Sequence, residues 1–114
     1  MYDFQNLLVY KKAKILNTKV YGLIRNNRGI DRYIESQLKR ASISMVINIA
    51  EGSGKSTHKD QRKYYTIARA SAYECVSLIE ILIDLRVITD EIVSSMLIQF
   101  DEISKMLYAL VNSR

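Results

Sequence analysis

Apolar residues recur along this chain at alternating steps of four and three, the spacing that places them on one face of a helix. The pattern fills four segments, at about residues 4–25, 30–51, 58–85 and 90–112. Short stretches at residues 26–29, 52–57 and 86–89 interrupt it. The sequence therefore predicts four long helices joined by short loops.

The first and fourth segments each carry one apolar stripe. In the first segment the stripe is Val9, Ala13, Leu16, Val20 and Leu23, and in the fourth it is Met96, Phe100, Ile103, Leu107 and Leu110. Thr89 is the predicted N-cap of the fourth helix, with Ile88 and Val93 at the positions of a hydrophobic staple.

The second segment is apolar around most of its circumference. One stripe consists of Ile34, Leu38, Ala41, Met45 and Asn48, and the other faces carry Ile43, Val46, Ile47, Ile49 and Ala50. A helix of this kind is usually buried on more than one side. We expect one side to face the rest of the protein and another to face a neighbouring subunit.

The third segment has the most regular heptad spacing of the four. Its stripe is Tyr64, Ala68, Ser71, Cys75, Leu78, Leu82 and Leu85. Thr57 is the predicted N-cap, and Asp60 three residues later resembles the second half of a capping box.

The composition indicates an all-α fold. The 114 residues include no proline and only four glycines, too few turn residues for a sheet-rich domain of this size. The length fits a single domain, residues 1–114. Four long helices with short loops are most simply arranged as an antiparallel, up-down-up-down four-helix bundle.

The net charge of +5 favours acidic partners such as nucleic acid. The charge is uneven, because the first 29 residues carry six basic side chains against Asp3 alone. Cys75 is the single cysteine, the N-terminus does not resemble a secretory signal, and no apolar run approaches about 18 residues. We therefore expect a cytoplasmic protein with no disulfide and no membrane-spanning segment.

The sequence GSGKS at residues 52–56 resembles the end of a phosphate-binding loop. That loop requires G-x-x-x-x-G-K-[ST] after a strand, and Ile49, inside a helical run, holds the position of the first glycine. We interpret the stretch as a helix stop, with glycine in left-handed angles, followed by the next N-cap. Exposed amides with Lys55 at a helix start would also suit a phosphate of RNA or DNA.

The residue types needed for catalysis or metal binding are sparse. His58 is the only histidine, lies at a helix start and has no nearby catalytic partner, so we expect a surface residue. Cys75 lies on the apolar stripe and is typical of a small buried hydrophobe. One histidine and one cysteine far apart do not make a ligand cluster. We predict no catalytic residue, no metal site and no cofactor.

Four polar residues lie within mainly apolar stretches. Asn48 and Glu51 are three residues apart on the second helix, and Ser71 and Glu74 are three apart on the third. A carboxylate-bridged metal site would need Glu-x-x-His motifs, and the chain contains none. We predict a structural, buried hydrogen-bond network, with Arg40 or Arg69 as the counter-charge.

Basic residues are the candidates for nucleic-acid binding, although surface lysines are more often simply solvated. The net charge, the clustering of lysines on the first helix and the nearby Tyr10, Tyr64 and Tyr65 favour binding instead, and charge-dominated binding with little base reading would fit them. The candidates are Lys11, Lys12, Lys14, Lys19, Lys39, Arg40, Lys55, Arg62, Lys63 and Arg69.

Three stretches carry a family resemblance: FQNLLVYKKA, QLKRASISMVINIAEGSGKS and YYTIARASAYE. NIAEG followed by A-x-x-S-x-x-E, here Ala68, Ser71 and Glu74, is the most specific part. The chain resembles the bacterial four-helix-bundle family that includes proteins encoded in intervening sequences of 23S ribosomal RNA genes.

The resemblance implies an antiparallel four-helix bundle that assembles into a ring-like homopentamer. The family is also similar to the accessory variability determinant of diversity-generating retroelements, which partners a reverse transcriptase and its RNA. The implied function is that of a non-enzymatic homo-oligomeric scaffold that binds nucleic acid, with RNA as the favoured partner. It would serve as an accessory protein of a reverse transcriptase. The alternative is a purely structural, protein-interaction bundle with no nucleic-acid role.

Overall fold

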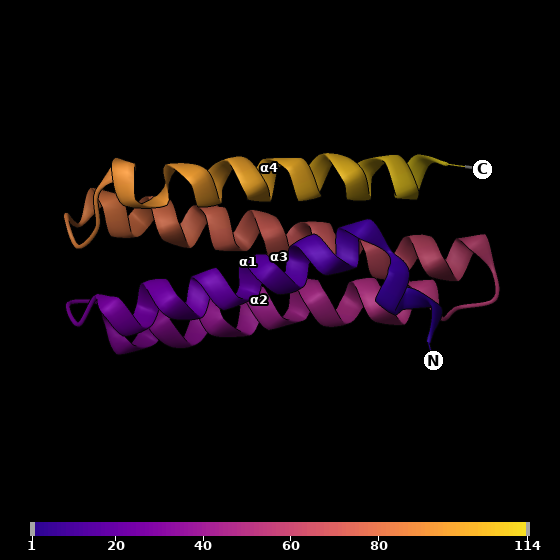
Figure 1. Cartoon of the computed structure of the whole chain (residues 1–114), viewed down its shortest axis with the longest axis horizontal. Helices are drawn as coiled ribbons and strands as arrows, with labels where there is room; N and C mark the ends of the chain where they lie inside the picture. The colour runs from indigo at the N-terminus through magenta and orange to yellow at the C-terminus, as the bar shows by residue number, and fades with distance from the viewer. Residues whose placement is uncertain (1, 114) are drawn as a thin grey trace.

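The computed structural model describes residues 2–113. A 3₁₀ helix, η1 (Asp3–Asn6), precedes four α-helices: α1 (Leu8–Asn26), α2 (Arg32–Ser53), α3 (His58–Asp84) and α4 (Asp90–Asn112). The helices lie side by side and alternate in direction, which confirms the predicted up-down four-helix bundle (Figure 1). The bundle measures 44 × 26 × 22 Å. The α2–α3 turn and both termini lie at one end of the bundle, and the other two turns lie at the opposite end (Figure 1).

Side-chain caps set the starts of three helices. Thr57 accepts a hydrogen bond from the Asp60 amide at 3.1 Å, and Thr89 accepts one from the Ile92 amide at 3.4 Å, so both predicted N-caps are confirmed. Asp31 caps α2 by accepting from two amides, those of Tyr33 and Ile34. The helix consequently begins at Arg32, two residues after the predicted start.

The predicted start of the first helix, near residue 4, is wrong. Leu7 has an extended backbone with φ of −68° and ψ of 128°, which separates η1 from α1. The ring of Phe4 packs edge-on against the ring of Tyr10, with 4.9 Å between centroids. This contact and the packing of η1 against both α1 and α2 accompany the break between η1 and α1.

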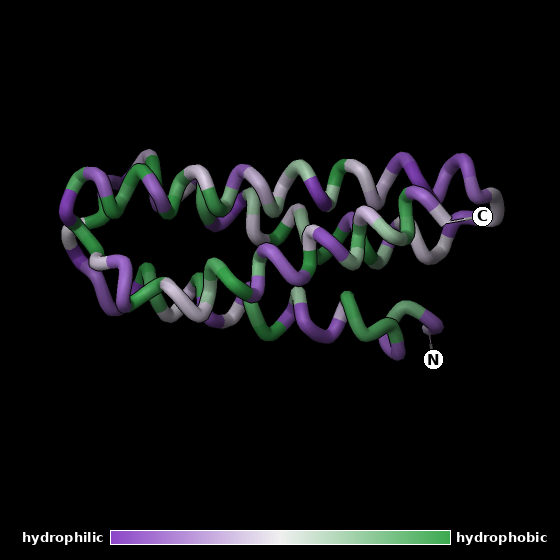
Figure 2. The backbone as a smooth tube through the Cα atoms, turned by 90° about the horizontal axis from the view of Figure 1, so that it is seen from above, coloured by the Kyte–Doolittle hydropathy of each residue, from purple (hydrophilic) through white to green (hydrophobic). Residues whose placement is uncertain are grey.

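The apolar stripes meet in one core, and hydrophobic positions alternate with hydrophilic ones along every helix (Figure 2). The stripes predicted for the first and fourth helices are buried except for Leu110, which is partly buried. The core's fully buried large side chains include Leu16, Leu38, Met45, Ile79, Phe100 and Leu107.

The predicted stripe of α3 needs a correction. Leu85 is 58% exposed because the helix ends at Asp84, and Tyr64 and Leu78 are only partly buried. The buried face passes instead through Tyr65, Ala68, Ala72, Cys75, Ile79 and Leu82, alongside Ser71. Because α3 packs against both α2 and α4, its buried face is centred between those two helices rather than on the side toward α2.

The α2–α3 turn ends a helix as predicted, but for a different reason. Gly54 caps α2 with φ of −85°, and no glycine among residues 2–113 has a positive φ. Gly52 lies within the last turn of α2, where a Cβ atom would lie 2.8 Å from Cε1 of Tyr65. Glycine is therefore required at residue 52 for close packing of α2 on α3, not for left-handed backbone angles. Ile49, at the place of a phosphate loop's first glycine, is a buried core residue of α2.

Candidate nucleic-acid interface

Basic side chains gather where α3 begins. Lys59, Arg62 and Lys63 are exposed on its first two turns, and Lys55 lies in the preceding turn. Between residues 55 and 69, Asp60 is the only acidic residue. Among the described residues, 2–113, none of these four cations is within ion-pair distance of a carboxylate. Their positive charge is therefore not neutralised by a direct ion pair within the described chain.

Tyr64 supports two of these cations. The Lys55 ammonium lies 4.8 Å from the centroid of its ring, and the Lys63 ammonium lies 5.7 Å from it. Cations within about 6 Å of a ring face are attracted by its quadrupole. The Tyr64 ring thus attracts two like charges of this cluster.

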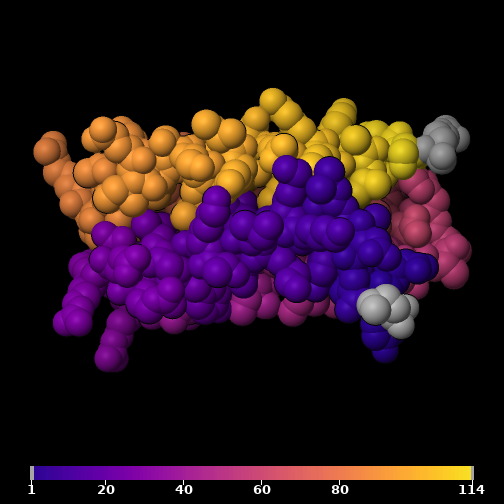
Figure 3. Space-filling view, viewed as in Figure 1, coloured from indigo at the N-terminus to yellow at the C-terminus, as the bar shows by residue number. Residues whose placement is uncertain are grey.

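Two lysines of α1 belong to the same end of the bundle. Lys11 and Lys14 are exposed near the start of α1, and the Lys14 ammonium lies 5.6 Å from the ring centroid of Tyr10. Figure 3 shows the start of α1 and the start of α3 at the same end of the molecule. We call this group the basic end; it consists of Lys11, Lys14, Lys55, Lys59, Arg62 and Lys63.

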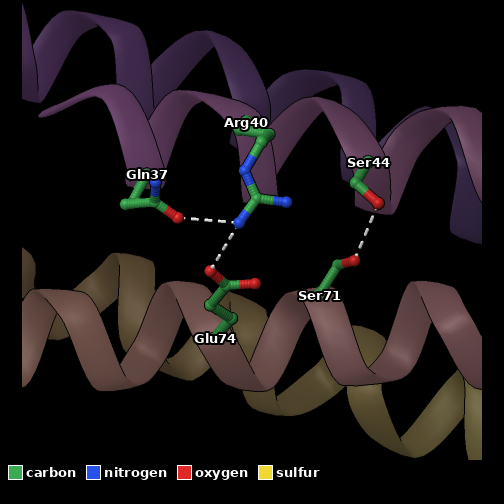
Figure 4. Close-up of polar contacts among 5 residues, drawn as sticks. All are labelled: Gln37, Arg40, Ser44, Ser71 and Glu74. Carbon is green, nitrogen blue, oxygen red and sulfur yellow. Dashed lines mark hydrogen bonds and ion pairs between the residues drawn. The ribbon is translucent and has the colours of Figure 1, made fainter. Parts of the chain in front are cut away.

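Three of the predicted basic residues are paired within the chain. Lys12 lies 3.2 Å from Glu102 on α4, and Lys39 lies 3.2 Å from Glu35 one turn earlier on α2. Lys39 also lies over the ring of Tyr21 at 5.5 Å. Arg40 contacts Glu74 on α3 at 3.2 Å and donates to Gln37 at 2.7 Å (Figure 4). The ten predicted residues therefore do not form one surface of free charge.

Lys19 and Lys59 differ from the paired residues. Lys19 is exposed, nearer the middle of α1 than the basic end. Lys59 was not among the predicted residues, although its spacing of four from Lys63 indicates a shared helix face. It is exposed at the start of α3 and belongs to the basic end.

Arg69 lies in a different setting, between α3 and α4. Its guanidinium lies 4.9 Å from the ring centroid of Tyr73 and 5.1 Å from that of Tyr108. Its Nε donates to the carbonyl of Ser104 at 3.1 Å, and a terminal nitrogen donates to the Tyr73 hydroxyl at 2.9 Å. These contacts fix the arginine head in the lining of a groove of about 530 Å³.

The predicted polar network is present in part, and its centre is a residue that the pattern did not single out. Ser44 Oγ accepts from Ser71 Oγ at 2.9 Å and from Asn48 Nδ2 at 3.1 Å (Figure 4 shows the serine pair). Asn48 also donates to the Ser44 carbonyl at 2.8 Å. The sequence pattern of α2 does not indicate a role for Ser44. Its role follows from the Ser44–Ser71 hydrogen bond, which forms only when α2 and α3 pack together.

The two predicted carboxylates occupy different places. Glu74 pairs with Arg40, one of the two expected counter-charges, and the pair lies at the surface rather than in the core. Glu51 is exposed, so its predicted place in a buried network is wrong. Three residues turn a helix by about 300°, so Glu51 is offset from Asn48 by about 60° around the helix axis. Glu51 is exposed and Asn48 is half-buried.

The single cysteine and histidine behave as expected from their positions. Cys75 is fully buried, and burial, followed by the negative charge of Glu74, raises the pKa of its thiol to about 12. Burial also raises the pKa of Tyr65. His58 is exposed at the start of α3. Within residues 2–113 no three potential metal-ligating side chains gather, and no helix there is long and apolar enough to cross a membrane.

The described residues form an all-α four-helix bundle, and comparison with known proteins identifies the family. Residues 5–109 match the family described as 23S rRNA-intervening sequence protein. The chain belongs to this family.

A solved structure supports the same fold. It is the crystal structure of a protein with unknown function from the S23 ribosomal protein family of Bacteroides thetaiotaomicron. The two chains are 24% identical, superpose with a TM-score of 0.86, and align over 93% of this chain and all of the other. No protein with a curated description matches this sequence.

Proposed function

We propose that this protein binds nucleic acid through the basic end, with RNA as the favoured partner, and that it has no catalytic role of its own. The observation that carries the proposal is the cluster of Lys55, Lys59, Arg62 and Lys63, which has no carboxylate partner among the described residues. Such charges attract phosphates and release counterions on binding, with little dependence on base sequence. The resemblance to proteins of ribosomal RNA intervening sequences favours RNA as the partner.

We further propose that the protein works as a homo-oligomer, a pentamer by resemblance to its family. The α2–α3 face supports this, because it leaves isoleucines in water. Ile43 and Ile47 on α2 and Ile67 on α3 are all exposed. Ser44 of α2 and Ser71 of α3 are in contact, and Ile47 and Ile67 each lie about one turn from that contact in the same direction along the antiparallel pair, so we infer that the two isoleucines lie near one another. A ring would also repeat the basic end and raise avidity for a long RNA.

Binding assays on charge-reversal variants test the proposal against the alternative of a purely structural bundle. The Lys11→Glu, Lys14→Glu variant changes exposed residues of the basic end, and Lys12 is left intact because it pairs with Glu102. The matched control, Arg25→Glu with Arg28→Glu, reverses two exposed charges near the opposite end. Fluorescence anisotropy with labelled RNA measures affinity, and light scattering measures the mass of the assembly.

The expected result is an affinity loss of about tenfold or more for the Lys11, Lys14 variant, at unchanged mass, with a much smaller loss for the control. Dissociation of the assembly with RNA binding unchanged would favour the structural alternative. Substitution of Ile47 by Lys tests the proposed subunit face, because a charge buried between apolar surfaces is unfavourable and the mass should fall.

We extend the proposal to a protein partner, a reverse transcriptase in the cytoplasm, on the strength of the family resemblance alone. Purification of the native complex, followed by sequencing of bound RNA and mass spectrometry of bound proteins, tests this extension. Recovery of a reverse transcriptase together with its RNA is the expected result. Recovery of RNA without that enzyme would leave an RNA-binding protein and remove the accessory role.

A further inference from the structure

A groove between α3 and α4 presents two aromatic rings next to a fixed arginine. Tyr73 and Arg69 come from α3 and Tyr108 comes from α4, and all three line the groove of about 530 Å³. The two tyrosine side chains are 55% and 56% exposed. Aromatic rings exposed to this extent retain surface on which a further planar group can stack.

The arginine is held in place while keeping most of its hydrogen-bonding capacity. A guanidinium carries five N–H donors, and the two bonds to Ser104 and Tyr73 use two of them. No carboxylate within residues 2–113 forms an ion pair with Arg69. Because the backbone carbonyl and the two rings already position the charge, an anion that binds it loses little side-chain entropy.

The groove's other lining residues limit the chemistry of its ligand. Around Arg69 and the two tyrosines they are apolar or neutral: Thr66, Ala70, Val111 and Asn112. The adjoining part of the α3–α4 groove, beyond Tyr73, is lined by three carboxylates, those of Glu74, Glu80 and Asp101. A polyanion would therefore be repelled at that side and would extend the other way.

The other way leads to the basic end. Arg62 lies seven residues, or two turns, before Arg69 on α3, so the two arginines lie on the same helix face. The rise along a helix puts them about 10 Å apart along the axis. The exposed face between them carries Thr66, a neutral hydroxyl residue. Within the described part of the chain, no carboxylate lines the groove around Arg69 or the Thr66 position between the two arginines, so a phosphate chain could run from the groove to the basic end.

We propose that this groove binds a single-stranded segment of nucleic acid, with bases stacked on Tyr73 and Tyr108 and a phosphate on Arg69. A duplex has its bases already stacked and offers none to the rings, so the groove would select single strands. Stacking of this kind tolerates any base, since every base has a π-face. The inference rests on the proposed nucleic-acid function and adds to it a strand preference and a location.

The test compares a tyrosine variant with a control at equal salt. The variant is Tyr73→Leu with Tyr108→Leu, which keeps apolar bulk and removes the aromatic faces. The control is Tyr33→Leu, which changes a tyrosine that is 70% exposed near the start of α2, at the opposite end of the bundle. The probes are a labelled, unstructured RNA of about 15 nucleotides, within the range of known single-strand sites, and a blunt RNA duplex of equal length.

The double variant should lose about tenfold or more in affinity for the single strand and less than about twofold for the duplex, with the salt slope unchanged. Tyr33→Leu should change neither affinity. Circular dichroism checks the fold; if the double variant is unstable, Tyr108→Leu alone is used, with a correspondingly smaller loss. Arg69→Lys keeps the charge but lacks the planar fork, and it should weaken single-strand binding as well.

Four results would overturn the inference. An equal loss of affinity for single strand and duplex, or no loss for either, would show that the groove is not a single-strand site, while the proposed function of the basic end would stand. Dissociation of the assembly by the tyrosine substitutions, seen by light scattering, makes the groove a subunit contact instead. Absence of binding to both RNAs by the parent protein removes the proposed function and this inference together.

Discussion

Gly52 of α2 and the ring of Tyr65 of α3 approach so closely that a Cβ atom at residue 52 would lie 2.8 Å from Cε1 and 2.9 Å from Cδ1. Tyr65 is buried, so its ring has little room to move. The contact joins the last turn of α2 to the second turn of α3, beside the basic end. The GSGKS stretch thus serves to pack two helices together.

Gly52→Ala should therefore destabilise the protein by about 1–2 kcal/mol, because forcing a methyl group into packed side chains outweighs the gain in helix propensity. Urea unfolding measures the change. Gly54→Ala is the matched control: its Cβ would meet nothing nearer than 3.6 Å and its φ of −85° suits alanine. That variant should be neutral or slightly more stable, and equal losses for both glycines would contradict the packing role.

Much of the fold was predictable because it depends on local signals. The caps Thr57 and Thr89 and the four-three spacing act within one helix, and the predicted α3 and α4 begin at the observed residues. The start of α1 was not predictable from spacing, since it depends on how the Phe4 ring packs against Tyr10.

The candidate site was less predictable because it depends on which helices meet. The Lys12–Glu102 ion pair joins residues ninety positions apart, and no helical pattern relates them. The same holds for Arg40 and Glu74, whose pairing follows from the α2–α3 register. Basic residues could be counted from the sequence, but which of them stay free of a partner is a property of the packed bundle.

Glu51→Ala should change the free energy of unfolding by less than about 0.5 kcal/mol, because the side chain is exposed. Ser44→Ala should instead cost about 1 kcal/mol or more, since it removes the acceptor of the buried Ser71 hydroxyl. Chemical denaturation of the two variants side by side checks both values. A larger loss for Glu51→Ala than for Ser44→Ala would show that the network is centred elsewhere.

Arg86 is the one non-glycine residue within 2–113 that has a positive φ, 62°. It lies just after the end of α3, where its amide donates to the Ile83 carbonyl and the next amide, that of Val87, donates to the Leu82 carbonyl. Left-handed angles cost a residue with a Cβ about 1–2 kcal/mol. Arg86→Gly should therefore stabilise the protein by about 1 kcal/mol in thermal unfolding, whereas Arg86→Ala should not; a lower melting temperature for the glycine variant would contradict this account.

The buried thiol of Cys75 should make stability fall at alkaline pH. Its pKa in the folded protein is about 12, against about 8.5 in an unfolded chain. Between these values the unfolded form loses the proton and the folded form keeps it, so the free energy of unfolding decreases as pH rises. By pH 10 this should remove about 1–2 kcal/mol.

Cys75→Ala isolates that contribution. The substitution lowers stability at every pH through the lost packing volume, but it should flatten the decline between about pH 8.5 and 10 relative to the parent. Urea unfolding at pH 7 and pH 10 measures both slopes. Identical declines in the two proteins would show that Cys75 does not carry this effect.

Nucleic-acid binding by the basic end is the central claim, and the salt dependence of RNA affinity tests it most directly. Lys59→Ala, Arg62→Ala and Lys63→Ala together remove three exposed charges at the start of α3. The control triple, Arg25→Ala, Arg28→Ala and Arg32→Ala, removes three exposed charges near the opposite end, with the same change in net charge.

The affinity of the parent for a labelled single-stranded RNA should fall steeply between about 50 and 200 mM salt. The basic-end triple should bind about tenfold or more weakly, with the slope of log affinity against log salt reduced by about 2, while the control keeps the parent slope. Equal slopes and equal losses in the two triples, or no binding by the parent at about 50 mM salt, would contradict the claim.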